Sequence, residues 1–273
     1  MKSIALGQYY PSDSILHRLD GRTKILLATI FIVSLFFCKS MASFVFALAF
    51  TICIVLLARI PLRVIFRSLR AITFILIFTF IINVFLTDGE GEALFAWWIF
   101  EVYAEGIWNA IYIAVRIMCL ILASSVFISF TTTPIQLTYS IESLLSPLKK
   151  LKVPVHDFAM MMSIVLRFIP ALSEETEKIM TAQKSRGADF ESGSLIQRAK
   201  ALIPILIPLF VSAFRRSDEL ATAMECRCYH GGEGRTRMTV TKMKTIDYVF
   251  LALMLVCVAA IIMLNFIEFG YVM

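Results

Sequence analysis

The stretches EKIMTAQKSRG (residues 177–187) and DELATAMECRC (residues 218–228) look like two copies of one helix end. When Arg186 is aligned with Arg227, both stretches carry an acidic residue nine positions earlier, an apolar residue seven earlier and an alanine four earlier. Each stretch is predicted to close a long helix in the region from residue 155 to 237. A spacing of seven returns to nearly the same side of a helix, so each arginine is placed on an apolar stripe.

Arginines on apolar stripes need polar partners. A guanidinium group suits a carboxylate or a row of carbonyl oxygens in the groove of another protein, which makes Arg186 and Arg227 candidate docking residues. The alternative is that both side chains extend over the edge of a helical bundle and keep their charge in water. The residue pattern alone leaves both interpretations open.

The composition is that of an integral membrane protein. The 273 residues are 59% hydrophobic and 17% charged, and the mean hydropathy is +0.81, far from the mixture of a soluble domain. The formal net charge of +6 is assigned to cytoplasmic loops, so no nucleic-acid partner is expected. The six cysteines show no disulfide framework, and reduced thiols are expected throughout.

Residues 1–24 are polar, carry four basic residues and are interpreted as a cytosolic or interfacial arm. No secretory signal peptide is expected, because the first apolar run resembles a span that is retained. That run is short, and Lys24 and Lys39 at its ends are expected to extend toward the headgroups. Only Lys39 and Ser40 separate it from the next run, which predicts a tight hairpin.

Five apolar segments are predicted to span the membrane. Four basic residues at spacings of three and four precede the third segment and are expected to face anionic headgroups. The predicted spans are residues 25–38, 41–57, 71–87, 106–130 and 246–267, and the basic stripe is Arg59, Arg63, Arg67 and Arg70.

Residues 88–105 carry five acidic residues and neither lysine nor arginine, which places them outside the cell. A solvated loop is favoured over a calcium site, since the twelve-residue ligand pattern is missing. Residues 93–103, with Trp97 and Trp98, are expected to form an amphipathic element at the interface. Arg116 in the fourth span is interpreted either as a functional residue or as one seated between helices, and the sequence does not decide.

The region of residues 131–245 is predicted to be cytosolic. A weaker amphipathic helix covers residues 134–151, Pro154 opens a long helix that Pro170 interrupts, and Ser192 caps the next long helix. Of the 26 Lys and Arg residues, one is assigned outside and one within a span, leaving 24 on the cytoplasmic side. With five spans the N-terminus is therefore inside, and the C-terminal tail after the last span, within residues 246–273, is outside.

No catalytic constellation is found, and the chain is not expected to be an enzyme or to hold a cofactor. The three histidines are far apart, and neither a zinc-protease helix motif nor a nucleophile elbow occurs. Cys226, Cys228 and His230 lie within five residues, but their spacing is not that of common zinc sites, so no metal site is predicted. The glycine-rich run of residues 231–236 lacks the lysine of a phosphate loop and is interpreted as a turn.

The sequence resembles the transmembrane coupling subunits, or T components, of energy-coupling factor transporters, which are ABC-type importers of vitamins and transition metals. The resemblance covers nearly the whole chain. It rests on the arm motif (residues 14–24), on the order of the spans and on two helix ends with a small residue, an arginine and a glycine. Ser185-Arg186-Gly187 fits this motif, whereas Cys226-Arg227-Cys228 departs from it at the glycine, as Gly21 departs from the proline of relatives.

The resemblance implies an organisation in four parts. These are an arm (residues 1–24), four transmembrane helices (25–130), a cytosolic coupling domain with two long crossing helices (131–245), and the last transmembrane helix with an outside tail (246–273). The expected fold is thus an all-α polytopic protein with five transmembrane helices in a prokaryotic cell membrane. Cysteine in place of glycine at Cys228 fills space at the second helix end.

The resemblance also implies the partners. Residues 185–187 and 226–228 dock into grooves of two cytosolic ABC ATPase subunits, and the long helices transmit ATPase closure to a substrate-binding S component in the membrane. One alternative is the dedicated cobalt or nickel version of this subunit. Another, from a different class, is a stand-alone secondary transporter, which the lack of repeated spans or paired half-helices disfavours.

Overall fold

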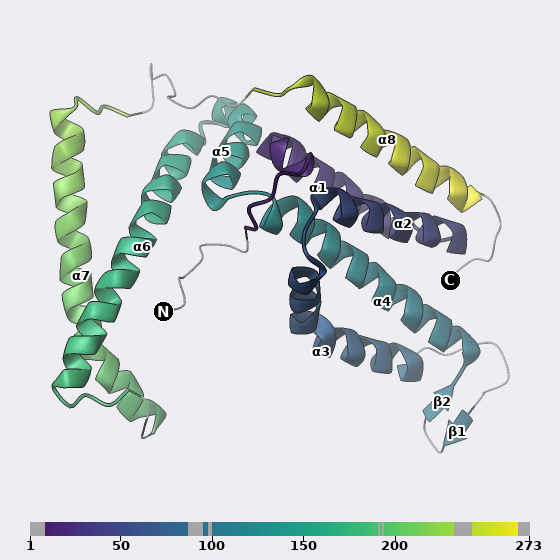
Figure 1. Ribbon diagram of the computed structural model, residues 1–273, viewed down its shortest axis with the longest axis horizontal. Coiled ribbons are helices and arrows are strands. Elements are labelled where there is room, and N and C mark those ends of the chain that lie inside the picture. Colours follow the sequence, from purple (N-terminus) through teal and green to yellow (C-terminus); the bar gives the residue numbers. More distant parts are fainter. Residues whose placement is uncertain are drawn as a thin grey trace. The chain divides into compact units, whose positions relative to one another are not determined.

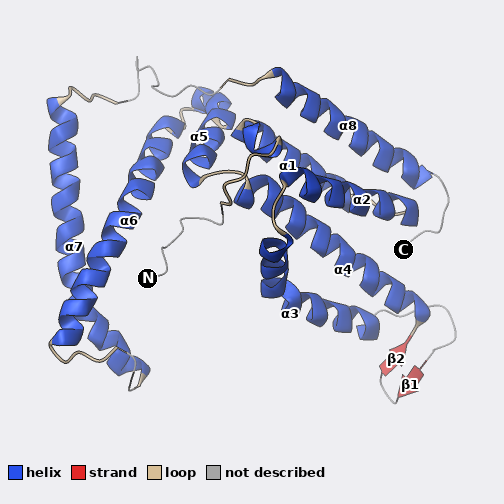
Figure 2. Cartoon of the chain, in the orientation of Figure 1, coloured by secondary structure: helices blue, strands red, loops and turns tan. Residues whose placement is uncertain are grey.

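The computed structural model describes residues 9–86, 95–97, 100–190, 192, 194–231 and 242–266. The described residues form two compact units: a bundle unit within residues 5–143 and 240–273, and a helix-pair unit within residues 144–239. Helices dominate both units, as Figures 1 and 2 show. The predicted all-α class is therefore confirmed, and the one departure among the described residues is a small β-hairpin.

The bundle unit is built mainly from long α-helices. A short 3-10 helix, η1, lies in the N-terminal arm, and the π-helical segment η2 continues α4 without a break. The helices are η1 (Leu16–Arg18), α1 (Gly21–Phe36), α2 (Met41–Ala58), α3 (Leu62–Leu86), α4 (Ala104–Ser124), η2 (Ser125–Phe130), α5 (Pro134–Leu144) and α8 (Thr245–Phe266).

The core of the bundle unit lies where α1 and α2 each contact both α4 and α8. Side chains spaced three or four apart face this core, since that spacing keeps them on one side of a helix. Buried hydroxyl groups also lie there and donate to carbonyl oxygens of their own helices: Ser43 to Ser40 at 2.7 Å and Thr51 to Ala47 at 2.8 Å. Small residues of this kind let membrane helices approach closely.

Several helices are long and apolar enough to cross a membrane, which agrees with a multi-pass membrane protein. Helix α1 has 16 residues and falls short of that length by itself, and α3 bends by 55° near residue 71, where its basic segment gives way to an apolar one. The predicted set of spans and the candidate set therefore differ in their members. The candidates by length and composition are residues 41–58, 104–130, 155–185, 196–226 and 245–266, with the bent helix α3 as a further one.

The predicted tight turn between α1 and α2 is present, and side chains from two other helices hold it. The Asn265 amide of α8 donates to the carbonyl oxygen of Phe37 at 2.6 Å, and its oxygen accepts from the N–H of Lys39 at 3.1 Å. From α4, Arg116 Nη2 donates to the Cys38 carbonyl oxygen at 3.2 Å. Because a positive charge suits the C-terminal end of a helix, these contacts favour Arg116 as a residue seated between helices.

The N-terminal arm packs into the bundle unit. Leu16 and Leu19 are buried, and so is Lys24, which is only 2% exposed. The Lys24 ammonium donates to the carbonyl oxygens of Thr131 at 2.7 Å and His17 at 3.3 Å. The expectation that Lys24 extends toward the headgroups was therefore wrong, because its four-carbon stem reaches inward to backbone carbonyls that need donors.

The segment predicted as an amphipathic interface element contains an antiparallel β-hairpin, β1 (Phe95–Trp97) and β2 (Phe100–Val102), in which Trp97 pairs with Phe100. The acidic residues 88–92 and Trp98 lie outside the described residues. Aromatic and β-branched residues dominate residues 95–103, and such residues favour strands.

The helix-pair unit consists of η3 (Ser146–Leu151), α6 (Val155–Ser185) and α7 (Leu195–Cys226). Within this unit α7 crosses α6, and the two helices run in opposite directions, so their C-terminal ends lie at opposite ends of the pair (Figure 1). An ion pair joins them where Arg216 Nη2 approaches Glu175 Oε2 at 2.6 Å. Helices of 31 and 32 residues span roughly 45 Å each at 1.5 Å per residue.

Two helices differ from the sequence-based expectations in their extent. Helix α6 does begin after Pro154, but it continues through Pro170, because a proline removes only its own N–H bond and the flanking turns remain paired. The expected helix over residues 134–151 is divided into α5 and the 3-10 helix η3.

The cap of α7 is Ser194 and not Ser192. The Ser194 hydroxyl accepts from the Gln197 N–H, and the Gln197 side chain accepts from the Ser194 N–H, which forms a capping box. Ser192 instead donates to the Asp189 carboxylate.

Candidate functional site

The first candidate docking end is the C-terminus of α6, where Arg186 is the capping residue. The N–H of Gly187 donates to the Lys184 carbonyl oxygen at 3.0 Å, and the N–H of Ala188 donates to the Gln183 carbonyl oxygen at 3.0 Å. This pair of bonds is a Schellman motif, which requires a left-handed residue after the cap. Gly187 supplies it with φ of +86°.

The C-terminus of α7 repeats this geometry around Arg227. The N–H of Cys228 donates to the Glu225 carbonyl oxygen at 2.8 Å, and the N–H of Tyr229 donates to the Met224 carbonyl oxygen at 3.0 Å. Cys228 takes the left-handed position with φ of +54°. The likeness in sequence is thus matched by the same backbone hydrogen bonds at both helix ends.

Both arginines are exposed at their helix ends. Among the residues that the structure describes, neither guanidinium group has a hydrogen-bond or ion-pair partner. Ile179 and Leu220, seven residues before them, are half-buried, and Glu177 and Asp218, nine residues before, are exposed. A rigid cap therefore presents each unpaired cation at the end of a long helix, where a carboxylate or a set of carbonyl oxygens from another protein can bind it.

The effect of cysteine in place of glycine is conformational as well as steric. The sequence indicated that the Cys228 side chain fills space, but it did not indicate the left-handed backbone. Such a conformation costs a residue with a side chain about 1 kcal/mol or more relative to glycine. The glycine at the equivalent position of the first end is the signal that could have revealed it.

The side chains of Cys226, Cys228 and His230 do not form a cluster suited to a metal ion. Across the described residues, no three His, Cys, Asp or Glu side chains gather in an arrangement that could hold one. Of the glycine-rich run, only Gly231 is described, and it also has a positive φ of +98°.

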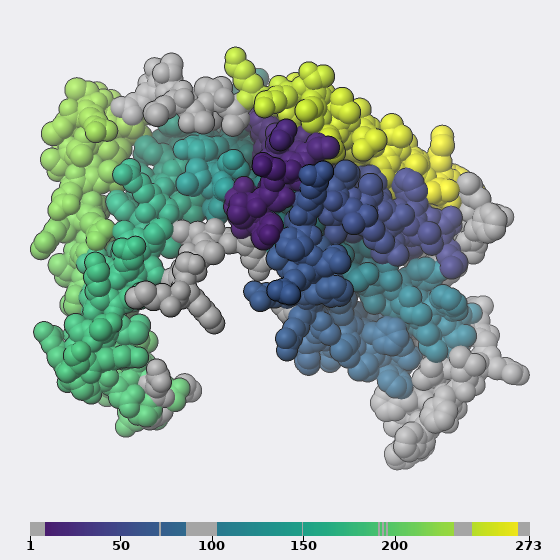
Figure 3. Space-filling model, viewed as in Figure 1, coloured from purple at the N-terminus to yellow at the C-terminus, as the bar shows by residue number. Residues whose placement is uncertain are grey.

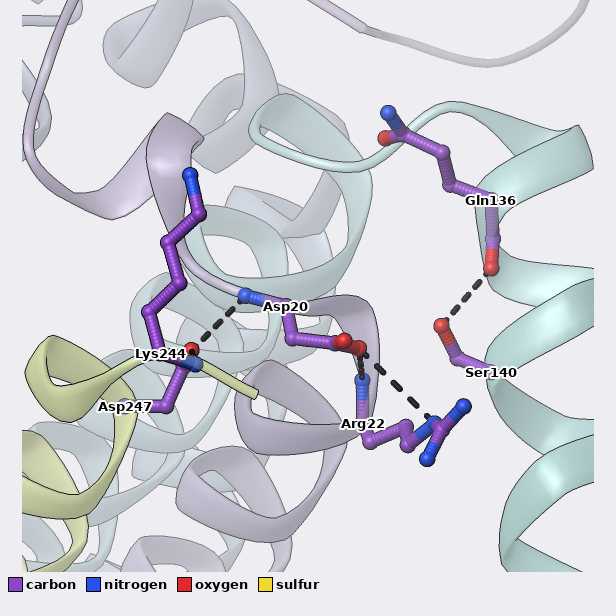
Figure 4. Close-up of polar contacts among 6 residues, drawn as sticks. All are labelled: Asp20, Arg22, Gln136, Ser140, Lys244 and Asp247. Carbon is purple, nitrogen blue, oxygen red and sulfur yellow. Dashed lines mark hydrogen bonds and ion pairs between the residues drawn. The ribbon is translucent and has the colours of Figure 1, made fainter. Parts of the chain in front are cut away.

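A second polar cluster joins the arm to α8 in the bundle unit (Figure 4). The Asp247 carboxylate accepts from the N–H of Asp20 at 2.9 Å with one oxygen and from the N–H of Lys244 at 2.7 Å with the other. Asp20 in turn caps α1 by accepting from the N–H of Arg22 at 3.0 Å. Asp247 is 1% exposed and was missed in the sequence, although an acid in the first turn of an apolar helix is a recognisable capping signal.

The same region explains Gly21. A Cβ atom at this position would lie 2.1 Å from the Ser140 hydroxyl oxygen and 3.2 Å from its Cβ. That hydroxyl donates to the Gln136 carbonyl oxygen at 2.7 Å. In this chain Gly21 therefore leaves room for the Ser140 hydroxyl, where α5 approaches the first turn of α1.

Comparison with known proteins agrees with the sequence resemblance. The sequence model of the CbiQ family, described as cobalt transport protein, matches residues 12–240. The energy-coupling factor transporter transmembrane protein EcfT of Clostridium kluyveri is 48% identical over 95% of this chain and 96% of its own length. The proteins of the same name from Ruminiclostridium cellulolyticum and Bacillus subtilis are 46% identical over 98% of this chain and 100% of theirs, and 47% identical over 87% and 89%.

These matches extend across the arm, the bundle helices and both arginine-bearing helix ends. They cover nearly the full length of this chain and of its relatives, so the likeness belongs to the protein as a whole. The chain belongs to the CbiQ family and, within it, to the transmembrane components of energy-coupling factor transporters.

Proposed function

We propose that this chain is the coupling subunit of its transporter, and that it transmits ATP-driven motion of two ABC ATPase subunits to a substrate-binding S component. Residues 185–187 and residues 226–228 are the two docking ends, one for each ATPase. The observation that carries the proposal is the repeated cap, which presents Arg186 and Arg227 in the same way at two helix ends. The chain itself performs no catalysis in this scheme, because ATP hydrolysis belongs to the partners.

The arrangement of the helix pair supports transmission of motion. Helices α6 and α7 cross, so a displacement of either end becomes a rotation at the crossing. Both helices also leave large apolar side chains exposed, which is a surface for a membrane partner. These side chains include Phe158, Met162, Val165, Leu206, Phe210 and Phe214. We assign this surface to the S component.

The proposed orientation keeps the helix pair in the cytosol, with the N-terminus inside and the C-terminus outside. Both helices are apolar enough to be candidate spans. If they crossed the membrane, however, the link between them would carry Lys184, Arg186, Arg198 and Lys200 to the outer face, against the positive-inside tendency.

The orientation is tested with a thiol reagent that does not cross membranes. Cys226 and Cys228 are exposed at the second end, and labelling is expected in inverted vesicles and not in intact cells. A variant with Ser185→Cys in a Cys226→Ser, Cys228→Ser background should behave in the same way. Labelling of Ser185→Cys from outside would show that the helix pair spans the membrane.

Docking is tested with Arg186→Ala, Arg227→Ala and the double variant in the complete transporter. Each single change is expected to weaken ATPase binding by about 2 to 5 kcal/mol, at least about 30-fold, because a charge-assisted contact is lost. Co-purification of the ATPases, ATP hydrolysis and substrate uptake are measured. Arg215→Ala is the matched control, since Arg215 is exposed on α7 away from the end. Normal uptake and co-purification in the double variant would remove the proposed role.

The two alternatives are not favoured. The relatives that match nearly the full length carry the energy-coupling factor name, which argues against a dedicated cobalt or nickel subunit. It also argues against a stand-alone secondary transporter, which would transport substrate in liposomes without ATPases.

A further inference from the structure

A pocket of about 540 Å³ lies in the bundle unit between the N-terminal arm and the C-terminal end of α2. The arm and α2 are neighbours in the space-filling view, where the arm is purple and α2 is indigo (Figure 3). One wall comes from the arm and the other from the last turns of α2. The lining residues are Asp13, Ser14, Ile15, Arg18, Cys53, Leu56, Leu57 and Arg59.

The wall from the arm is held in place by its own hydrogen bonds. Ser14 Oγ lies 2.7 Å from His17 Nδ1, and His17 Nε2 lies 2.9 Å from the Tyr10 carbonyl oxygen. Leu16 is buried beneath this turn. Arg18 therefore projects from a fixed support, which lowers the entropic cost of binding a ligand there.

The wall from α2 ends in an uncommon backbone conformation. Arg59 is the capping residue of α2 with φ of +51°, a left-handed conformation that is strained for a residue with a side chain. Asparagine and glycine adopt it more readily. Strain of this kind at a residue lining a pocket points to a role for its side chain.

The lining of the pocket carries a net positive charge. Arg18 and Arg59 are exposed, and within the described part of the chain neither guanidinium group has a hydrogen-bond or ion-pair partner. Asp13 is the acidic group in the lining, which leaves two positive charges against one negative charge. Such a lining suits a phosphate group that bears further hydroxyl groups, because Asp13 can accept hydrogen bonds from those hydroxyls.

The α2 wall of the pocket also carries apolar side chains, within one turn of Arg59. Leu56 is 67% exposed and Leu57 is 39% exposed, and both belong to a helix that is a candidate membrane span. A second, almost entirely apolar crevice of about 50 Å³ shares Cys53 and Leu57 with the pocket and extends between η1, α2 and α8. The combination of a basic lining at the helix terminus and apolar side chains along a membrane helix matches a phospholipid and not a free phosphate.

We propose that this pocket binds one anionic glycerophospholipid. The phosphate lies between Arg18 and Arg59, head-group hydroxyls donate to Asp13, and an acyl chain lies along Leu56 and Leu57. The exposed basic stripe that continues into α3 is distinct from this site, because Arg63, Arg67 and Arg70 do not line the pocket.

The test is native mass spectrometry of the full chain in detergent, with phosphatidylglycerol and phosphatidylcholine of identical acyl chains as probes. One phosphatidylglycerol is expected to bind preferentially. Arg18→Gln and Arg59→Gln should each weaken it about fivefold, and the pair about 25-fold, since a basic residue near a lipid surface contributes about that factor. Arg63→Gln, on the stripe outside the pocket, should change binding less than about twofold.

Two further variants separate binding from folding and lipid from phosphate. Arg59→Gly removes the guanidinium but suits the left-handed backbone, so lipid binding should fall while the melting temperature does not. Leu56→Ser should weaken phosphatidylglycerol binding and leave any binding of inorganic phosphate unchanged.

Several results would overturn the proposal. The first is equal binding of phosphatidylglycerol and phosphatidylcholine. The second is unchanged phosphatidylglycerol binding in the double variant Arg18→Gln, Arg59→Gln, and the third is full displacement of the lipid by inorganic phosphate. Loss of a protein partner in these variants, with lipid binding intact, would instead identify a protein-docking pocket.

Discussion

The bundle unit and the helix-pair unit satisfy their polar groups in opposite ways. In the bundle unit, buried side chains such as Lys24 and Asp247 bond to backbone groups more than a hundred residues away. In the helix-pair unit the cross-helix ion pair is between Glu175 and Arg216, whose side chains are 25% and 36% exposed, and pairs of this kind contribute little. The bundle unit thus uses its own buried polar contacts for stability, whereas the exposed contact of the helix-pair unit is consistent with the proposed docking role.

Gly21 in the bundle unit and Gly187 in the helix-pair unit also differ in the reason for glycine. Gly21 is favoured by space, since a Cβ atom there would meet Ser140. Gly187 is favoured by its positive φ and not by space, since a Cβ atom there would have nothing within 4 Å. Packing thus selects glycine in the bundle unit, whereas cap geometry selects it at a helix end that faces open space.

The strongest test of this contrast is the buried carboxylate of Asp247. Asp247→Ala leaves the N–H groups of Asp20 and Lys244 without their acceptor, and the loss of hydrogen bonds to a charged group costs about 1.5 to 3 kcal/mol each. We expect a lower melting temperature in detergent and loss of folded protein. Asp247→Asn should cost less, because its carbonyl oxygen can still accept one of the two bonds. A melting temperature unchanged by Asp247→Ala would break the comparison.

An intermediate effect is expected at Gly21. Gly21→Ala forces the Ser140 hydroxyl aside and should destabilise the bundle unit by about 1 to 3 kcal/mol, as overpacking does. Ser140→Ala alone should be nearly neutral, since its hydroxyl bonds only within its own helix. The double variant should regain part of the lost stability in thermal unfolding. Additive effects of the two changes would contradict a direct contact.

The smallest effect is expected at the two caps. Gly187→Ala should destabilise the last turn of α6 by about 1 kcal/mol, and Cys228→Gly should stabilise the last turn of α7 by a similar amount. The reason is that glycine adopts positive φ without the steric cost of a Cβ atom. Amide hydrogen exchange at the last turns of α6 and α7 measures both effects. Slower exchange at α6 after Gly187→Ala would show that the cap does not depend on this conformation.

The sequence predicted the two helix ends well, because aligning the two copies of the repeat identifies equivalent residues at both ends. The spacing from Arg186 to Ala182 and Ile179 recurs at Arg227, and both become capping residues of long helices. The start of α6 after Pro154 was predicted as well, because proline marks the first turn of a helix.

Features that depend on distant residues were not predicted. A lysine at the edge of an apolar run has the same local sequence whether it reaches lipid headgroups or, as Lys24 does, the carbonyl oxygen of Thr131. The cap of α7, in contrast, has a local signal, because Ser194 is followed three residues later by Gln197. The prediction of Ser192 as the cap missed this capping box.

The bond between Asp20 and Asp247 has a consequence for biogenesis. Asp20 is translated before Asp247, which follows it by 227 residues. Until then the N–H of Asp20 lacks its acceptor. The residues of the helix pair also precede Asp247, so both long helices are synthesised before this bond can complete the bundle unit.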